Sequence, residues 1–185
     1  MDYDFDAKQT GFRAPAWMFA DRMCKTPRAF RRVAVLDTAQ GLEVRHLLSL
    51  GYRPENILAV NYSAAILAAM TLALRRDGIE GVQTKAGPFA AAVVKAGGRR
   101  HVLSFDTTSN LRSTAFGDLT ETIRVTTPEV LILVMLAGRE AGQSSCSLEV
   151  ITERCSSRHA SNGSAVLASH VGRLKLSAIL ALTGP

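Results

Sequence analysis

The sequence predicts an α/β protein with a doubly wound, mostly parallel sheet and helices on both faces. Three observations predict this fold. From residue 33 onward, short apolar runs alternate with stretches of helical periodicity. The runs are almost continuously apolar, as in strands buried on both faces. Glycines such as Gly51 and Gly78 stand where helices should end. Right-handed crossovers between such strands place helices on both faces.

The predicted elements follow in order. A helix over Ala14–Met23 opens the chain, with Pro15 suited to its first turn, and should pack near the carboxyl ends of the strands. Ser63 can cap a helix that is apolar almost all round, which predicts its burial between layers. Strands are expected at 33–37, 56–61, 81–85, 101–106 and 130–136, and the further helices at 41–50, 64–76, 89–95 and 115–125.

The pattern changes after Gly138. Short strands are expected at 148–152 and 165–168, and a final helix at 173–182. The sheet could therefore be incomplete at its C-terminal end. We divide the chain into an N-terminal helical extension, an α/β core and a C-terminal segment, over residues 1–32, 33–143 and 144–185.

Composition narrows the class of protein. The 185 residues, 47% hydrophobic and 21% charged, are typical of one globular domain with its own core. Three cysteines argue against a disulfide scaffold, and the acidic first residues do not resemble a signal peptide. The longest apolar run, Val130–Ala137, is too short to span a bilayer. We expect a cytoplasmic protein. No metal site is expected, because the spacing of Cys146, Cys155, His159 and His170 contains no knuckle.

The chain carries a net charge of +6. Basic pairs stand at Arg31-Arg32, Arg75-Arg76 and Arg99-Arg100. One interpretation is affinity for a nucleic acid or another acidic partner. The other is that these cations flank strands and helix C-termini, where solvated positive charge is ordinary. The sequence leaves both open.

Polar residues gather where the predicted strands end. Asp37 ends the first strand, Asn61 the second and Asp106 the fourth, and Gly87 follows the third. In an open α/β sheet the ligand lies outside the carboxyl ends of the strands. The sequence therefore predicts a ligand site at this edge.

The segment Val33–Glu43, with Asp37 and Gly41 after an apolar run, resembles motif I of the class I S-adenosylmethionine-dependent methyltransferases. The stretch Leu48–Asn61 is similar to the run into the second strand of that family, and Phe105–Leu111 to its fourth-strand motif. The resemblance covers about residues 31–140 and is greatest to small, divergent methyltransferase-like proteins of phages and mobile elements. It implies a Rossmann-like methyltransferase core.

The resemblance also implies a cofactor, S-adenosylmethionine, and roles for the residues at the edge. Asp37 would orient the first turn, Asn61 would hold the ribose, and Gly87 with Pro88 would lie beside the adenine. Asp106 would be the catalytic residue, nearest the transferred methyl group. The implied cofactor-binding residues are Asp37, Ala39, Gly41, Asn61 and Gly87.

Two departures from the family pattern keep a second interpretation open. Only Gly41 remains of the usual glycines, with Ala39 narrowing the turn, and Asn61 replaces an acidic residue. These favour a non-catalytic descendant of the fold, acting as a binding or structural subunit of a viral or mobile-element assembly, or as a homo-oligomer. Asp37 and Asp106 favour the other interpretation, an enzyme: a small methyltransferase acting on a nucleic acid or another acidic partner.

Overall fold

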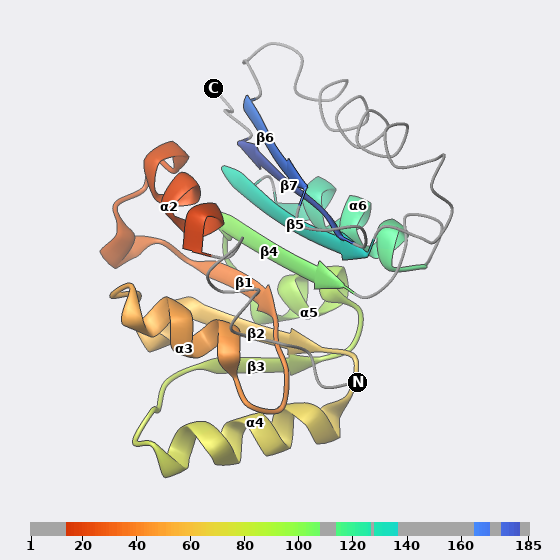
Figure 1. Ribbon diagram of the computed structural model, residues 1–185. Coiled ribbons are helices and arrows are strands. Elements are labelled where there is room, and N and C mark those ends of the chain that lie inside the picture. The colour runs from red at the N-terminus through yellow and green to blue at the C-terminus, as the bar shows by residue number, and fades with distance from the viewer. Residues whose placement is uncertain (1–13, 108–113, 127, 137–164, 171–174, 182–185) are drawn as a thin grey trace.

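The computed structural model describes residues 14–107, 114–126, 128–136, 165–170 and 175–181. Its centre is one seven-stranded sheet in the order β3-β2-β1-β4-β5-β7-β6 (Figure 1). Strands β1 to β5 are parallel, β7 is antiparallel to β5, and β6 is antiparallel to β7. The strands are β1 (Val33–Leu36), β2 (Ile57–Asn61), β3 (Gln83–Ala86), β4 (Val102–Thr107), β5 (Val130–Leu136), β6 (Ala165–His170) and β7 (Lys175–Ala181).

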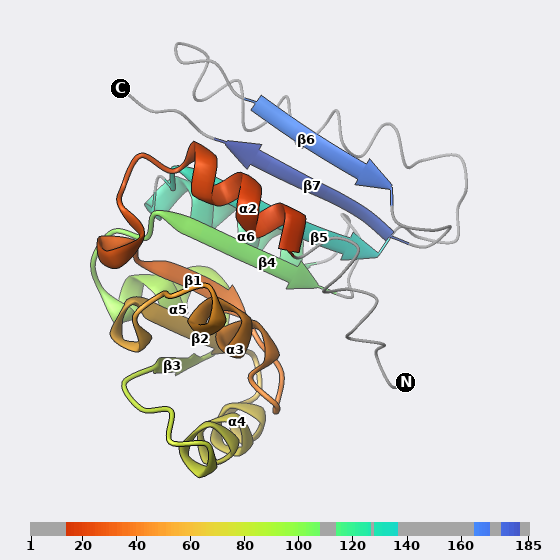
Figure 2. The same cartoon turned by 60° about the vertical axis from the view of Figure 1, so that its left-hand side comes forward.

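Helices cover both faces of the sheet (Figures 1 and 2). Val33 and Val35 of β1 join one hydrophobic cluster with side chains of α2, α3 and α4, whereas Ala34 joins another with α5 and α6. This alternation follows from the two-residue period of a strand. The helices are α2 (Ala14–Met23), α3 (Leu42–Ser49), α4 (Ala64–Arg76), α5 (Phe89–Ala96) and α6 (Thr114–Thr126), with short 3-10 turns η2 (Arg28–Phe30) and η3 (Pro54–Asn56).

The predicted fold class is confirmed. Strand β1 lies between β2 and β4, in parallel register with Val33 opposite both Ile57 and Val102. Ser63 caps α4 by accepting a hydrogen bond from the Ile66 N–H, as predicted. Among the described residues, no helix is both long and apolar enough to cross a membrane.

The expected final helix over 173–182 is wrong. Residues 175–181 form strand β7, which pairs with β5 along its whole length, with Ile179 opposite Ile132. Without β7, strand β5 would have unpaired backbone N–H and C=O groups along its edge. Pairing with this edge outweighs the helical preference of residues 175–181, which are rich in leucine and alanine. The sheet is thus extended beyond β5 by β7 and β6. The short strand expected at 148–152 lies outside the described residues.

The expected burial of α4 between layers is also wrong. Only Leu67, Met70 and Leu74 of this helix are buried, and they form one stripe that packs on the sheet. Leu72 is 54% exposed on the outer side. Helix α4 is rich in alanine, so most side chains on its outer face are small. Such a face can remain in contact with water without a second layer of structure over it.

Helix α2 lies along the sheet face and packs against β5 and β7 (Figure 2). Its Trp17 is fully buried, with its ring edge against the Tyr52 ring at a centroid distance of 5.8 Å. Trp17 is therefore a core side chain, while the neighbouring Met18 is exposed.

Candidate functional site

Three of the predicted site residues are joined by hydrogen bonds at the carboxyl edge of the sheet. The Asn61 side-chain amide donates to the Asp37 carbonyl oxygen at 2.8 Å. The Gly87 N–H donates to the Asn61 carbonyl oxygen at 3.1 Å. Asp106 lies near the end of β4, opposite Val134 of β5, at the same edge. The structure therefore brings the ends of β1, β2 and β3 into contact and places Asp106 on the neighbouring strand.

Asp37 holds the turn between β1 and α3. Its carboxylate is buried and accepts three backbone N–H groups, from Thr38 at 2.7 Å, Glu43 at 3.2 Å and Val44 at 2.9 Å. Two of these belong to the first turn of α3, whose N–H groups have no partner within the helix. Burial raises the pKa of Asp37 to about 6, against the lowering effect of the backbone hydrogen bonds. The geometry makes Asp37 an orienting residue of the turn.

Gly41 is the residue just before α3, its N-cap, and has the left-handed conformation with φ of 65°. A side chain at this position would place its Cβ 3.1 Å from Met70 Cγ and 3.1 Å from Leu74 Cδ2, both on α4. Gly41 thus allows both the positive φ and the close approach of α4. Ala39 is half-buried in the same turn, between the exposed Thr38 and Gln40.

Asn61 ties this turn to the start of α4. Besides its bond to the Asp37 carbonyl, its side-chain oxygen accepts the Ser63 N–H at 2.9 Å. An amide oxygen has two lone pairs, so one acceptor position remains for a ligand hydroxyl. The Asn61 residue as a whole is half-buried.

The sequence analysis missed a buried contact behind the turn. The Glu43 carboxylate is buried and accepts the Trp17 indole N–H at 2.9 Å and the Ser104 hydroxyl at 3.2 Å. These residues come from α3, α2 and β4. The only sequence signal was the position of Glu43 in the first turn of the helix, where a carboxylate is favourable. Helix α2 is thereby fixed to the site.

A second missed contact lies beside Gly87. The Tyr62 hydroxyl donates to Asp118 Oδ2 at 2.9 Å, and Asp118 also accepts the Ala90 and Phe89 N–H groups at the N-terminus of α5. Burial and the carboxylate raise the pKa of Tyr62. Tyr62 is nevertheless 53% exposed, directly after Asn61 in the chain. Tyr62 therefore places an aromatic ring at the carboxyl edge. The only indication of this in the sequence is that Tyr62 directly follows the last residue of a predicted strand.

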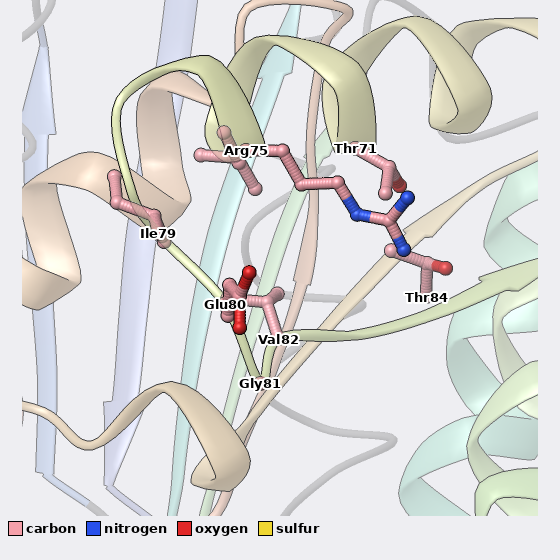
Figure 3. Close-up of a pocket in the computed structure, with 8 residues that line it drawn as sticks. Thr71, Arg75, Ile79, Glu80, Gly81, Val82 and Thr84 are labelled. Carbon is pink, nitrogen blue, oxygen red and sulfur yellow. The ribbon is translucent and has the colours of Figure 1, made fainter.

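A cavity of about 280 Å³ lies away from this edge, between the C-terminal half of α4 and the start of β3 (Figure 3). In Figure 3 the Arg75 side chain extends toward Thr71 and Thr84, with Glu80 on the other side of the cavity. Leu74 also lines it. Neither Asp37 nor Asn61 lines this cavity, so it is separate from the predicted site.

Comparisons with known proteins identify the fold. A ribosomal protein L11 methylase from Lactobacillus delbrueckii subsp. bulgaricus is similar with a TM-score of 0.59 and 16% identity, over 89% of this chain and 75% of that one. The methyltransferase domain of bacterial CtHen1 has a TM-score of 0.64 and 10% identity, over 98% of this chain and 100% of that one. An rRNA methylase from Streptococcus thermophilus has a TM-score of 0.59 and 11% identity, over 94% and 99%.

These three solved structures are methyltransferases, and the chain has their Rossmann-like fold. No protein-family model matches the chain, and no curated protein matches it at a significant level. The comparisons give no support to the phage or mobile-element type that the sequence resemblance implied.

Proposed function

We propose that the protein is an S-adenosylmethionine-dependent methyltransferase that acts on a nucleic acid. The observation that carries the proposal is the likeness of nearly the whole chain to solved methyltransferases, with TM-scores of 0.59 to 0.64. Fold alone does not fix function, so the residues of the carboxyl edge must also suit the cofactor.

These residues do suit it. The cofactor is a sulfonium cation with a ribose and an adenine. Asn61 has a free acceptor position for a ribose hydroxyl, and the exposed ring of Tyr62 can pack against a purine. Asp37 and Asp118 place two carboxylates at this edge, and negative charge is compatible with a sulfonium. The donor set and its charge therefore fit S-adenosylmethionine.

The proposed roles follow from these positions. Asp37 keeps the β1–α3 turn in shape through its three backbone contacts, and Gly41 lets α4 close against that turn. The backbone at Gly87 and the backbone at Ala39 border the proposed cofactor site on opposite sides. The bound cofactor supplies an activated methyl group. Asp106, on the strand next to β1, orients or deprotonates the acceptor atom, whose alignment matters more than a strong base.

Two observations support a nucleic acid as the acceptor. The net charge of +6 favours binding of a polyanion. Similar structures include the rRNA methylase from Streptococcus thermophilus and a putative RNA methyltransferase from Pyrococcus horikoshii. We also propose that the protein is cytoplasmic, like other proteins that act on RNA in the cell interior. Residues 1–32, 33–143 and 144–185 are proposed as its N-terminal extension, α/β core and C-terminal segment.

Isothermal titration with S-adenosylmethionine and S-adenosylhomocysteine tests the cofactor assignment. Tyr62→Ala should weaken binding about tenfold, since stacking of one base on an aromatic ring is worth about 1–3 kcal/mol. Phe30→Ala is the matched control, because Phe30 is 69% exposed and belongs to η2, remote from the carboxyl edge. Asp37→Ala should weaken binding more than Asn61→Ala, because it removes the acceptor of three N–H groups. Equal losses in Tyr62→Ala and Phe30→Ala would contradict the site.

Catalysis is tested separately on an RNA acceptor. Asp106→Asn keeps the shape of the side chain and removes its charge. It should lower turnover and leave cofactor affinity within a few-fold, because the residue is proposed to face the acceptor. If no cofactor binds at millimolar concentration, the enzyme proposal fails and the interpretation as a non-catalytic binding subunit replaces it.

A further inference from the structure

The cavity between α4 and β3 has opposite charges on two of its sides (Figure 3). The Arg75 side chain extends from α4 toward Thr71 and Thr84. The Glu80 carboxylate lies on the other side of the cavity. The volume of about 280 Å³ is slightly smaller than that of the pockets that hold drug-sized ligands, so it suits a small molecule.

The connection from α4 to β3, which forms one wall of the cavity, is held by backbone hydrogen bonds. The Gly78 N–H donates to the Arg75 carbonyl oxygen at 3.0 Å. The Ile79 N–H donates to the Leu74 carbonyl oxygen at 2.9 Å. These two bonds form a Schellman motif, for which Gly78 supplies the positive φ of 72°. The wall of the cavity is therefore formed by the fold itself and does not require a ligand.

Part of the cavity surface is apolar. Leu74 is 3% exposed and belongs to the larger hydrophobic cluster, against which Ile79 and Val82 pack. All three side chains line the cavity. A polar group placed against them without a hydrogen-bond partner would be unfavourable. The ligand is therefore expected to have an apolar body beside its charged groups.

The Arg75 guanidinium is not neutralised by a neighbouring carboxylate. Among the ion pairs of the described residues, none includes Arg75 or Glu80. The next acidic residue along the chain from Arg75 is Asp77, and it pairs with Arg45 of α3 at 2.5 Å. A guanidinium group presents a planar fork of N–H donors that matches the two oxygens of a carboxylate. Arg75 can therefore bind an anionic group in the cavity.

The hydroxyl groups and the carboxylate that line the cavity define which partners each side accepts. The Thr71 hydroxyl donates to the Leu67 carbonyl oxygen at 2.8 Å, so its oxygen can only accept a further hydrogen bond. The Thr84 hydroxyl, on the edge strand β3, can donate to an anion beside Arg75. An ionised carboxylate only accepts, so Glu80 suits a cationic group. The two sides thus differ in the charge that they can bind.

We propose that this cavity binds a small zwitterion whose carboxylate and ammonium groups are separated by an apolar body, as in an ω-amino acid or a short peptide. The carboxylate pairs with Arg75, the ammonium pairs with Glu80, and the body lies against Ile79 and Val82. A ligand with two charges of the same sign would be repelled by one of the two charged side chains. The site is separate from the carboxyl edge and does not depend on methyl transfer.

The affinity should be modest. Arg75 and Glu80 are both exposed, so water screens each ion pair with the ligand. Dissociation constants in the millimolar range are therefore expected, and NMR titration of the labelled full chain is a suitable measurement. The probe is 6-aminohexanoate, and hexanoate and hexylammonium each lack one of its charges. Amide signals of Gly81, Val82 and Thr84 report on the cavity, and that of Asn61 reports on the carboxyl edge.

Four variants separate the two charges of the cavity from charge in general. Arg75→Gln and Glu80→Gln each remove one charge from the cavity and should not prevent folding, because both residues are exposed. Arg76→Gln and Glu55→Gln are the matched controls, because both residues are exposed and neither lines the cavity.

The probe 6-aminohexanoate should shift the signals of the cavity and leave that of Asn61 unchanged. Hexanoate and hexylammonium should each bind about fivefold more weakly, which is the effect of one exposed ion pair. Arg75→Gln and Glu80→Gln should weaken binding of 6-aminohexanoate by the same factor, and the two control variants should change it less than twofold. Leucine, whose charges are adjacent, should bind more weakly than 6-aminohexanoate.

No shift of the cavity signals at millimolar probe concentration overturns the site. Equal affinity for 6-aminohexanoate and hexanoate, or equal losses in Arg75→Gln and Arg76→Gln, overturns the pairing of both charges. Tighter binding of dileucine than of 6-aminohexanoate identifies the occupant as a short peptide, and the reverse identifies it as an ω-amino acid. S-adenosylhomocysteine should not displace the probe; displacement overturns the separation of this site from the cofactor site.

Discussion

Gly41→Ala is the most informative single change to the fold of the site, because two effects at this residue can be separated by a control. The residue has φ of 65°, and an added Cβ would lie 3.1 Å from Met70 and Leu74. Gly78 has a similar φ of 72°, but an added Cβ would meet nothing within 4 Å. Gly78→Ala therefore reports the backbone strain alone, and Gly41→Ala reports strain plus crowding against α4.

The expected magnitudes follow from these contacts. A non-glycine residue in the left-handed region costs about 1–2 kcal/mol, which is the whole effect expected for Gly78→Ala. Crowding in a packed core adds about 1–3 kcal/mol for Gly41→Ala. In a chain of this length each kcal/mol lowers the melting temperature by about 2–4 °C. Gly41→Ala should therefore unfold at the lower temperature of the two.

Urea unfolding of both variants measures these free energies, and titration with S-adenosylhomocysteine measures the effect on the turn. Gly41→Ala should lose more stability and more cofactor affinity than Gly78→Ala. Equal losses of stability would refute the reasoning that Gly41 is required for the approach of α4.

Two further predictions concern the residues around the turn. Because the pKa of Asp37 is raised to about 6 by burial, the folded protein retains this proton where the unfolded chain has lost it. Wild-type stability relative to Asp37→Asn should therefore fall as pH rises from about 4 to about 6, and urea titrations showing a rise would contradict it. Trp17→Phe removes the indole donor to Glu43 and should cost about 1–3 kcal/mol in urea unfolding. Ser104→Ala removes the longer contact to the same oxygen and should cost less; the reverse order would contradict the assignment of Glu43 as the partner of Trp17.

The sheet from β1 to β5 could be predicted because its strands are apolar runs separated by helices with identifiable caps. Ser63 and Gly78 mark the two ends of α4 in the sequence and do so in the structure. Strand β7 could not be predicted in this way. Its alanines and leucines suit a helix, and only the pairing with β5, which is distant in the chain, determines its conformation.

The site was predictable in its location and less so in its contacts. The order of strands brings Asp37, Asn61 and Gly87 together, as the pattern of polar strand ends predicted. The family resemblance implied that Asp37 orients the turn. The three N–H groups that its carboxylate accepts could not be identified from the sequence, because a strand-end aspartate has the same pattern whether it faces a ligand or a helix N-terminus. The contacts of Tyr62 with Asp118 depend on a helix more than fifty residues away.

A crystal structure of the protein with S-adenosylhomocysteine tests the central claim most directly. The account predicts the ligand at the carboxyl edge, with its ribose at Asn61, its adenine against Tyr62 and its amino-acid portion at the turn that Asp37 holds. Density for the ligand in the cavity between α4 and β3, or no bound ligand at millimolar concentration, would contradict it.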